Sequence, residues 1–189
     1  MRIIECTEYE WVAKYQIKNS PDLKRDTETF LSVIESNKGI IYKVANSYCN
    51  NEENRKDLIQ EIVLQLWLSF HKYDEKHKLS TWMYTIALNV AISFYRKEHR
   101  RNDINHALPE DILHLNEDYS AHTRNTDLDN LHRFIKELKE IDRAIIILYL
   151  EENSQQEIGE MLGLTVTNVS TRVSRIKQQL QQKFSTIKA

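Results

Sequence analysis

The chain has 189 residues, 41% of them hydrophobic and 29% charged, and its 26 Lys and Arg against 28 Asp and Glu give a formal net charge of −2. This composition is typical of one or two globular domains, and it excludes a protein that coats nucleic acid through bulk positive charge. The longest apolar run, Ala144 to Leu150, is far shorter than the roughly 20 residues of a membrane-spanning helix, and Met1 to Trp11 lacks the pattern of a secretory signal, so we expect a cytoplasmic protein without direct membrane insertion.

The residue types predict an all-α protein. Only three glycines and two prolines interrupt long stretches rich in Leu, Ile, Lys, Glu and Gln, which favour helices. The alternation of apolar and polar residues that is typical of strands is hard to find. Cys6 and Cys49 are too few for a disulfide framework or a four-ligand zinc site, so we interpret them as reduced thiols and expect no cofactor.

One change in composition divides the chain. Residues 102–129 hold one basic residue against seven acidic ones, together with scattered Asn, His, Ser and Thr. We therefore predict an N-terminal extension of unassigned role at 1–25, a helical domain at 26–101, an acidic linker at 102–129 and a second helical domain at 130–189.

The expected helix 57–70 has a second apolar face opposite its core stripe. Two leucines lie there among polar residues, and we call this set the leucine face: Asp57, Gln60, Glu61, Leu64 and Leu68. Leucines on an outer face invite a partner protein, but another helix of the same domain covering them is an equally open interpretation. The carboxylates at spacing of four, Glu53, Asp57 and Glu61, indicate a solvated face rather than a metal or acid–base site, because no histidines accompany them.

A second helix is expected to begin at an N-cap of Ser80 or Thr81 and to run to about Arg101. One set of residues lies off the core stripe of this helix. We call it the tryptophan line: Trp82, Thr85, Asn89, Ser93, Arg96 and Arg100. An aromatic ring, small hydrogen-bonding groups and guanidinium groups suit nucleic acid, and Tyr73, Lys78 and Ser80 lie just before the line. The alternative is a core tryptophan at a domain edge above a solvated polar face.

The second domain carries the start and stop signals of several helices. Helices are expected over 131–138 and 140–150, followed by a capping box at Ser154 and Glu157. Gly163 is placed to end the short third helix in a left-handed turn, and Thr165 to cap the next one. The inner face of that last helix is predicted to be Val166, Val169, Val173, Ile176 and Leu180.

A short helix, a glycine turn and a second helix form a helix-turn-helix, whose second helix enters the major groove of DNA. Its outward residues are all hydrogen-bonding or cationic, and we call them the recognition set: Thr167, Asn168, Ser170, Thr171, Arg172, Ser174, Arg175 and Lys177. The segment 165–189 has five basic residues and no acidic one. A purely structural pair of helices, with cationic ends that suit the helix dipole, remains the alternative.

Together these motifs resemble a known family. Asp57 to Glu61 (DLIQE) and Leu79 to Asn89 (LSTWMYTIALN) are similar to the second region of bacterial sigma factors of the extracytoplasmic function type. Ser154 to Lys177 is similar to the helix-turn-helix of the fourth region of these factors. The two resemblances occur in the family's order, with its linker between them.

The resemblance implies a role for each surface. The leucine face corresponds to the surface that binds the β′ clamp helices of core RNA polymerase. A second contact is expected between the chain and the β flap of the polymerase. The tryptophan line, with Tyr73, Lys78 and Ser80, matches the part that captures single-stranded bases of the minus-ten promoter element. The recognition set falls where the family reads the minus-thirty-five element as duplex. Members are often held by an anti-sigma factor, so such a partner is expected too.

The sequence therefore predicts a promoter-specificity subunit with no chemistry of its own. The alternative is a helix-turn-helix regulator that binds duplex DNA without polymerase. An enzyme is a third hypothesis, in which His106, His114 and His122 of the acidic linker would hold a metal. Their spacing of eight places them on no common helical face, and no phosphate loop or nucleophile motif accompanies them.

Overall fold

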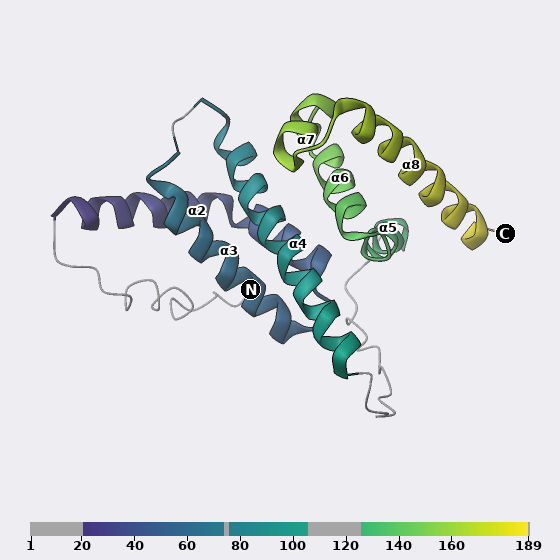
Figure 1. Cartoon of the computed structure of the whole chain (residues 1–189), viewed down its shortest axis with the longest axis horizontal. Coiled ribbons are helices and arrows are strands. Elements are labelled where there is room, and N and C mark those ends of the chain that lie inside the picture. Colours follow the sequence, from purple (N-terminus) through teal and green to yellow (C-terminus); the bar gives the residue numbers. More distant parts are fainter. Residues whose placement is uncertain (1–20, 74–75, 106–125, 189) are drawn as a thin grey trace.

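The computed structural model describes residues 21–73, 76–105 and 126–188, with side chains at 27–73, 76–101 and 127–187. Every regular element in these ranges is an α-helix, which confirms the predicted class (Figure 1). The helices are α2 Pro21–Tyr48, α3 Glu52–Phe70, α4 Leu79–Asn105, α5 Thr126–Lys136, α6 Glu140–Leu150, α7 Gln155–Leu162 and α8 Val166–Lys188.

The first three helices, α2, α3 and α4, pack against one another as an N-terminal bundle. The apolar stripe expected on α3 is its buried side, with Leu58, Ile62, Val63 and Leu66 in the core. Met83, Ala87 and Ala91 of α4 are buried opposite them, as their helical spacing predicts. Burial also raises the pKa of the free Cys49 thiol to about 11, so it stays protonated near neutral pH, while Cys6 lies outside the described residues.

Several predicted helix limits differ from the observed ones. The helix expected at 57–70 begins at Glu52, because the Oδ1 atom of Asn51 accepts a hydrogen bond from the Asn54 amide at 2.7 Å and caps it. The prediction of Ser80 or Thr81 as an N-cap was wrong, since α4 begins at Leu79 and the Trp82 amide donates to the Lys78 carbonyl at 3.1 Å. Helix α2 also begins at Pro21, inside the expected N-terminal extension.

The last four helices form a C-terminal bundle around α6. Phe134 and Ile135 of α5 are buried, as predicted, and Leu138 is buried too, but it lies after α5, which ends at Lys136 rather than at the expected residue 138. In α6 the buried residues extend beyond one stripe to Arg143, Ala144, Ile145, Ile146, Ile147 and Leu148. A helix buried around most of its circumference lies between other elements, and α6 contacts α4 and α2 as well as α5, α7 and α8. The two bundles therefore share an interface with α6 at its centre.

The helix-turn-helix has the predicted geometry. Ser154 Oγ accepts from the Glu157 amide at 3.2 Å, while the Glu157 carboxylate accepts from the Ser154 amide at 2.8 Å. Gly163 ends α7 with a φ of 66°, the left-handed conformation that glycine adopts without strain. Thr165 Oγ1 accepts from the Asn168 amide at 3.3 Å and caps α8, also as predicted.

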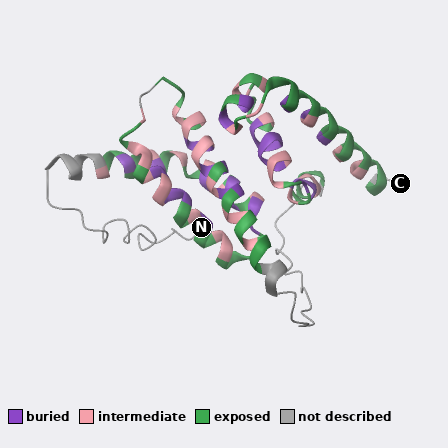
Figure 2. Cartoon of the chain, in the orientation of Figure 1, coloured by how far each residue is buried: buried purple, intermediate pink, exposed green. Residues whose placement is uncertain are grey.

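The inner face of α8 differs from the prediction at one residue. Val169, Val173 and Ile176 are buried, but Val166 is 49% exposed, so its assignment to the buried face was wrong. As the first residue of α8 it lies at the open end of the turn, where no described helix covers it. Figure 2 shows the resulting pattern, with a long exposed outer side on α8. None of the described helices has the length and apolarity that crossing a membrane requires.

Candidate nucleic-acid and partner interfaces

The leucine face lies on the outer side of α3. Asp57, Gln60 and Glu61 are exposed, Leu64 is half-buried and Leu68 is 53% exposed. The interpretation that another helix of the same domain covers both leucines therefore fails for Leu68 among the described residues. A large exposed leucine beside carboxylates has the chemistry of a protein-binding surface.

The tryptophan line begins in an aromatic cluster. The Trp82 ring is half-buried, with its centroid 6.3 Å from that of Phe70 and 5.3 Å from that of Tyr73. The Tyr73 hydroxyl donates to the His77 carbonyl at 2.9 Å, which ties the loop before α4 together. One side of Trp82 thus packs at the domain edge, as the alternative interpretation supposed, while Lys78 and Ser80 beside it are exposed.

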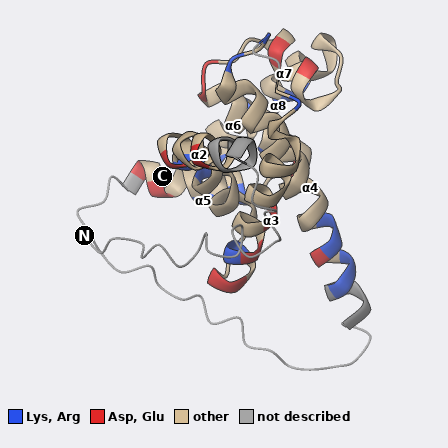
Figure 3. Cartoon of the chain, turned by 90° about the vertical axis from the view of Figure 1, so that its left-hand side faces the viewer, with Lys and Arg blue, Asp and Glu red and all other residues tan. Residues whose placement is uncertain are grey.

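The rest of the tryptophan line runs down α4 toward a basic end. Thr85 is half-buried and its hydroxyl donates to the Thr81 carbonyl at 2.8 Å, whereas Asn89, Ser93, Arg96 and Arg100 are exposed. Figure 3 shows Lys and Arg gathered at the C-terminal end of this helix. The Arg100 Nε atom donates to the Arg96 carbonyl at 3.3 Å. This end of α4 offers cationic donors suited to phosphates.

The recognition set occupies the outer and flanking sides of α8. Seven of its members are exposed, and Arg172 is half-buried. Lys177 leans on α6, where its Nζ atom donates to the Tyr149 hydroxyl at 2.6 Å and lies 4.3 Å from the ring centroid. Arg172 also turns toward α6, and its Nη1 atom lies 2.6 Å from Asp142 Oδ1. The set therefore has an outward part and two cations that contact the protein itself.

A groove of about 1110 Å³ runs along the same helix. It lies between α8 and the pair α5 and α6, and apolar residues such as Phe134, Leu138, Ile176 and Leu180 line it beside polar ones. Its walls also include five members of the recognition set, Thr167, Asn168, Thr171, Arg172 and Arg175, and its apolar part suits a protein segment.

Arg143 fixes the interface between the two bundles. Its guanidinium carbon lies 4.9 Å from the ring centroids of both Tyr48 on α2 and Tyr95 on α4. The guanidinium donates to the carbonyls of Ser47 and Leu138, each at 3.0 Å, and also to that of Lys136. Only 2% of this residue is exposed, and carbonyl dipoles and aromatic faces stabilise its charge, while its buried Nε atom has no hydrogen-bond partner.

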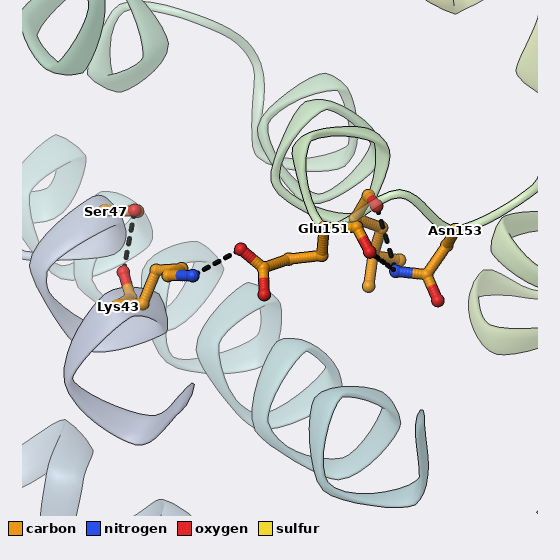
Figure 4. Close-up of polar contacts among 5 residues, drawn as sticks. Lys43, Ser47, Glu151 and Asn153 are labelled. Carbon is orange, nitrogen blue, oxygen red and sulfur yellow. Dashed lines mark hydrogen bonds and ion pairs between the residues drawn. The ribbon is translucent and has the colours of Figure 1, made fainter. Parts of the chain in front are cut away.

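Two ion pairs flank Arg143 at this interface. Arg96 of the tryptophan line lies 3.1 Å from Glu140 on α6, and Lys43 on α2 pairs with Glu151 just after α6 (Figure 4). Partial burial alone would raise the pKa of Glu140, but hydrogen bonds from its own amide and from Arg96, with the charges of Arg96 and Arg143, lower it. The pKa of Glu151 is lowered in the same way against its burial, chiefly by the hydrogen bond from Lys43. Both carboxylates are therefore stabilised in their ionised form.

Sequence reasoning missed Arg143 and its partners. A lone arginine inside the apolar helix 140–150 was the available signal, because an apolar helix that keeps one arginine must satisfy its charge locally. The proposed metal histidines His106, His114 and His122 lie outside the described residues. Within 21–73, 76–105 and 126–188, no group of three His, Cys, Asp or Glu residues is arranged to hold a metal.

Two family models match the two bundles of the chain. The family model described as Sigma-70 region 2 matches residues 33–101, and that described as Sigma-70, region 4 matches residues 128–180. The first covers most of α2, all of α3 and most of α4, and the second covers most of α5, all of α6 and α7 and most of α8.

Individual relatives match most of the chain. The ECF RNA polymerase sigma factor SigW of Bacillus subtilis (strain 168) is 27% identical over 93% of this chain and 98% of its own length. The RNA polymerase sigma factor SigV of the same organism is 29% identical over 80% of this chain and 89% of its own length.

Solved structures share the fold. The sigma factor RpoE of Bartonella quintana, in complex with the anti-sigma factor NepR, superposes with a TM-score of 0.65 and 21% identity over 86% of this chain and 98% of that one. CnrH, in complex with the cytosolic domain of CnrY, gives a TM-score of 0.59 and 19% identity over 85% and 90% of the two chains. With both sigma regions matched in order and relatives spanning nearly its full length, the chain belongs to the sigma-70 family, as a sigma factor of the extracytoplasmic function type.

Proposed function

We propose that this chain binds core RNA polymerase, directs it to specific promoters and assists promoter melting. The observation that carries the proposal is that one chain holds both sigma regions in order, each with an exposed surface of suitable chemistry. A helix-turn-helix regulator acting without polymerase does not account for the first bundle or its leucine face. This role involves no reaction catalysed by the chain itself and takes place in the cytoplasm.

The leucine face is the proposed contact with the β′ clamp helices. The exposed Leu68 supplies apolar area that binding removes from water, and Asp57 and Glu61 supply charge around it. The apolar part of the groove between α8 and the pair α5 and α6, lined by Phe134, Leu138, Ile176 and Leu180, is the proposed seat of the β flap, because such a lining suits a protein segment.

The two promoter contacts are assigned to different bundles. In the first, the Trp82 cluster and the exposed Asn89 and Ser93 are proposed to hold unpaired minus-ten bases, with Arg96 and Arg100 on phosphates. In the second, the outward part of the recognition set is proposed to read duplex minus-thirty-five DNA, as the second helix of such motifs does. An anti-sigma factor is the further partner that we propose, on the ground that the structural neighbours were solved with such inhibitors.

The polymerase assignment has a direct test. Replacing Leu64 and Leu68 together by Asp places two charges on the proposed interface, so we expect binding to core polymerase in a pull-down to weaken at least tenfold, on the order expected for hot-spot residues. If the double variant unfolds at a lower temperature than the unchanged chain, the single variant Leu68→Asp, at the more exposed position, replaces it in the pull-down.

The matched control is Leu31→Asp, which charges an exposed leucine (38%) on α2 of the same bundle. Its binding to core polymerase should equal that of the unchanged chain. Equal binding by the Leu64 and Leu68 variants would instead remove the leucine face from the polymerase interface.

A further inference from the structure

Arg172 is held by two oxygen atoms at once. Its Nη1 atom lies 2.6 Å from Asp142 Oδ1 on α6, and its Nε atom donates to Asn168 Oδ1 at 2.7 Å, one turn earlier on α8. The side chains of Arg172 and Asp142 are 36% and 21% exposed, so their pair is partly shielded from water. Salt and solvent therefore weaken it less than a pair at the open surface.

The chemistry of arginine fixes the orientation of the amide. A guanidinium has five N–H donors and no acceptor, so the only Asn168 atom that can face it is Oδ1. The amide nitrogen, Nδ2, must then point away from Arg172 with both of its hydrogens. In a free asparagine the oxygen and nitrogen could exchange places by rotation about the last side-chain bond, and here the bond from Arg172 opposes that rotation.

Asn168 occupies a position that can reach bases. It is the third residue of α8, it is exposed, and its backbone amide is already satisfied by Thr165 Oγ1 at 3.3 Å. In helix-turn-helix proteins the N-terminal residues of the second helix contact base edges in the major groove. An asparagine normally pairs with adenine by accepting from N6 and donating to N7, which needs both ends of the amide.

We propose that Asp142 and Arg172 are positioning residues that present Asn168 to promoter DNA as a hydrogen-bond donor. The position it reads then favours guanine, whose N7 and O6 atoms both accept, over adenine, whose N6 donor would face the donor Nδ2. This inference rests on the proposed reading of duplex DNA by α8. It also gives Arg172 a different role from the direct DNA contact expected of the recognition set.

The test is selection of promoter sequences by the reconstituted holoenzyme from a pool randomised over the minus-thirty-five element. The Asn168→Ala variant identifies the base position that Asn168 reads, because the selected sequences should lose their base preference at that position. The unchanged chain should favour guanine over adenine there by about tenfold, the discrimination that a good base contact provides. Arg172→Gln, which can both donate and accept, frees the amide to rotate, so this preference should fall to about twofold while other positions keep theirs.

Two further variants make the outcome decisive. Lys38→Gln breaks an ion pair on α2, that of Lys38 with Glu35, which involves no residue of α8, and should keep the selected sequence unchanged. Asp142→Ala removes only the anchor of Arg172 and should reduce the preference partway, which also tests the idea if Arg172→Gln folds poorly.

Several results would overturn the inference. One is an unchanged guanine preference in both Arg172→Gln and Asp142→Ala. Another is an equal loss of affinity for all sequences, which marks Arg172 as a phosphate contact. Adenine favoured by the unchanged chain at the Asn168 position would contradict the assigned orientation. Failure of the proposed function looks different, because the unchanged chain with core polymerase would then select no sequence.

Discussion

At the scale of single residues, Arg143 determines whether the two bundles stay together. A buried guanidinium is costly unless its donors are used, and here three backbone carbonyls accept from its terminal nitrogen atoms and two tyrosine rings lie against it, although Nε has no partner. One of those carbonyls and both rings belong to the N-terminal bundle. Arg143 therefore links the bundles through bonds that no smaller or apolar side chain can replace.

Replacing Arg143 by Ala should lower the free energy of unfolding by about 3 kcal/mol or more, because it leaves a cavity and unpaired buried carbonyls. Urea unfolding followed by circular dichroism measures this. The control is Arg101→Ala, which removes an exposed arginine paired with Glu98 at 3.0 Å and should cost less than about 1 kcal/mol. Similar losses for both variants would show that the Arg143 contacts contribute little.

At the scale of elements, the helix-turn-helix depends on a close approach at Gly159. A Cβ atom there would lie 2.7 Å from the Leu164 carbonyl oxygen, a backbone atom that cannot move without shifting the turn. The Leu164 amide donates to the Gly159 carbonyl at 2.8 Å, so a hydrogen bond between the same two residues closes the turn. The angle between α7 and α8 is therefore tied to the absence of a side chain at this residue.

Two glycine substitutions should have opposite effects. Gly159→Ala should destabilise the chain by about 1 to 3 kcal/mol, through overpacking against the turn. Gly39→Ala, within α2 and with nothing inside 4 Å of the added carbon, should stabilise it by about 0.5 to 1 kcal/mol, because alanine favours helix. Thermal unfolding measures both, and a destabilised Gly39→Ala or a neutral Gly159→Ala would contradict the packing described.

Elements marked by local signals could be predicted from the sequence. The capping box at Ser154, the left-handed Gly163 and the cap at Thr165 each depend on residues within one turn, and all three occur. The start of α4 was misplaced because Ser and Thr are also tolerated inside the first turn, where Leu79 already begins the helix.

Contacts between distant segments could not be predicted in this way. The pairing of Arg96 with Glu140 and of Arg172 with Asp142 joins residues that are far apart along the chain. Helical periodicity gives the face on which a residue lies but not the element that will cover it. The recognition set therefore included Arg172 and Lys177 as outward residues, although both turn toward α6.

At the scale of the whole molecule, the distance between the two described bundles is shorter than the distance between the two promoter elements. Elements about 25 base pairs apart are separated by about 85 Å along B-DNA. A compact chain of this length has a radius of gyration of only about 16 Å. Under the proposed function, the contacts of Arg96, Arg143 and Lys43 with the opposite bundle must therefore break when one chain engages both elements.

The interface between the bundles should weaken in acid. Glu140 and Glu151 have pKa values lowered below the ordinary 4.5, so their ionised forms stabilise the fold above that pH. This contribution is lost as the pH falls from about 4.5 through the lowered values, where both carboxylates take up protons. Replacing both residues by Gln removes the ionisable groups and should make the free energy of unfolding depend less on pH in this range.

Urea unfolding at a series of pH values from about 6 to 3.5 compares the unchanged chain with the double variant. The other carboxylates titrate in both proteins, so the difference between the two curves isolates Glu140 and Glu151. Parallel curves would show that these ion pairs add nothing to the interface.

The central claim is that the chain confers promoter specificity on RNA polymerase, and transcription with purified components tests it most directly. Core polymerase, this chain and a promoter selected from a random pool should give a transcript of defined start, with none when either protein is omitted. A chain that fails to bind core polymerase, yet binds a specific duplex sequence by itself, would contradict the account and support a regulator that acts without polymerase.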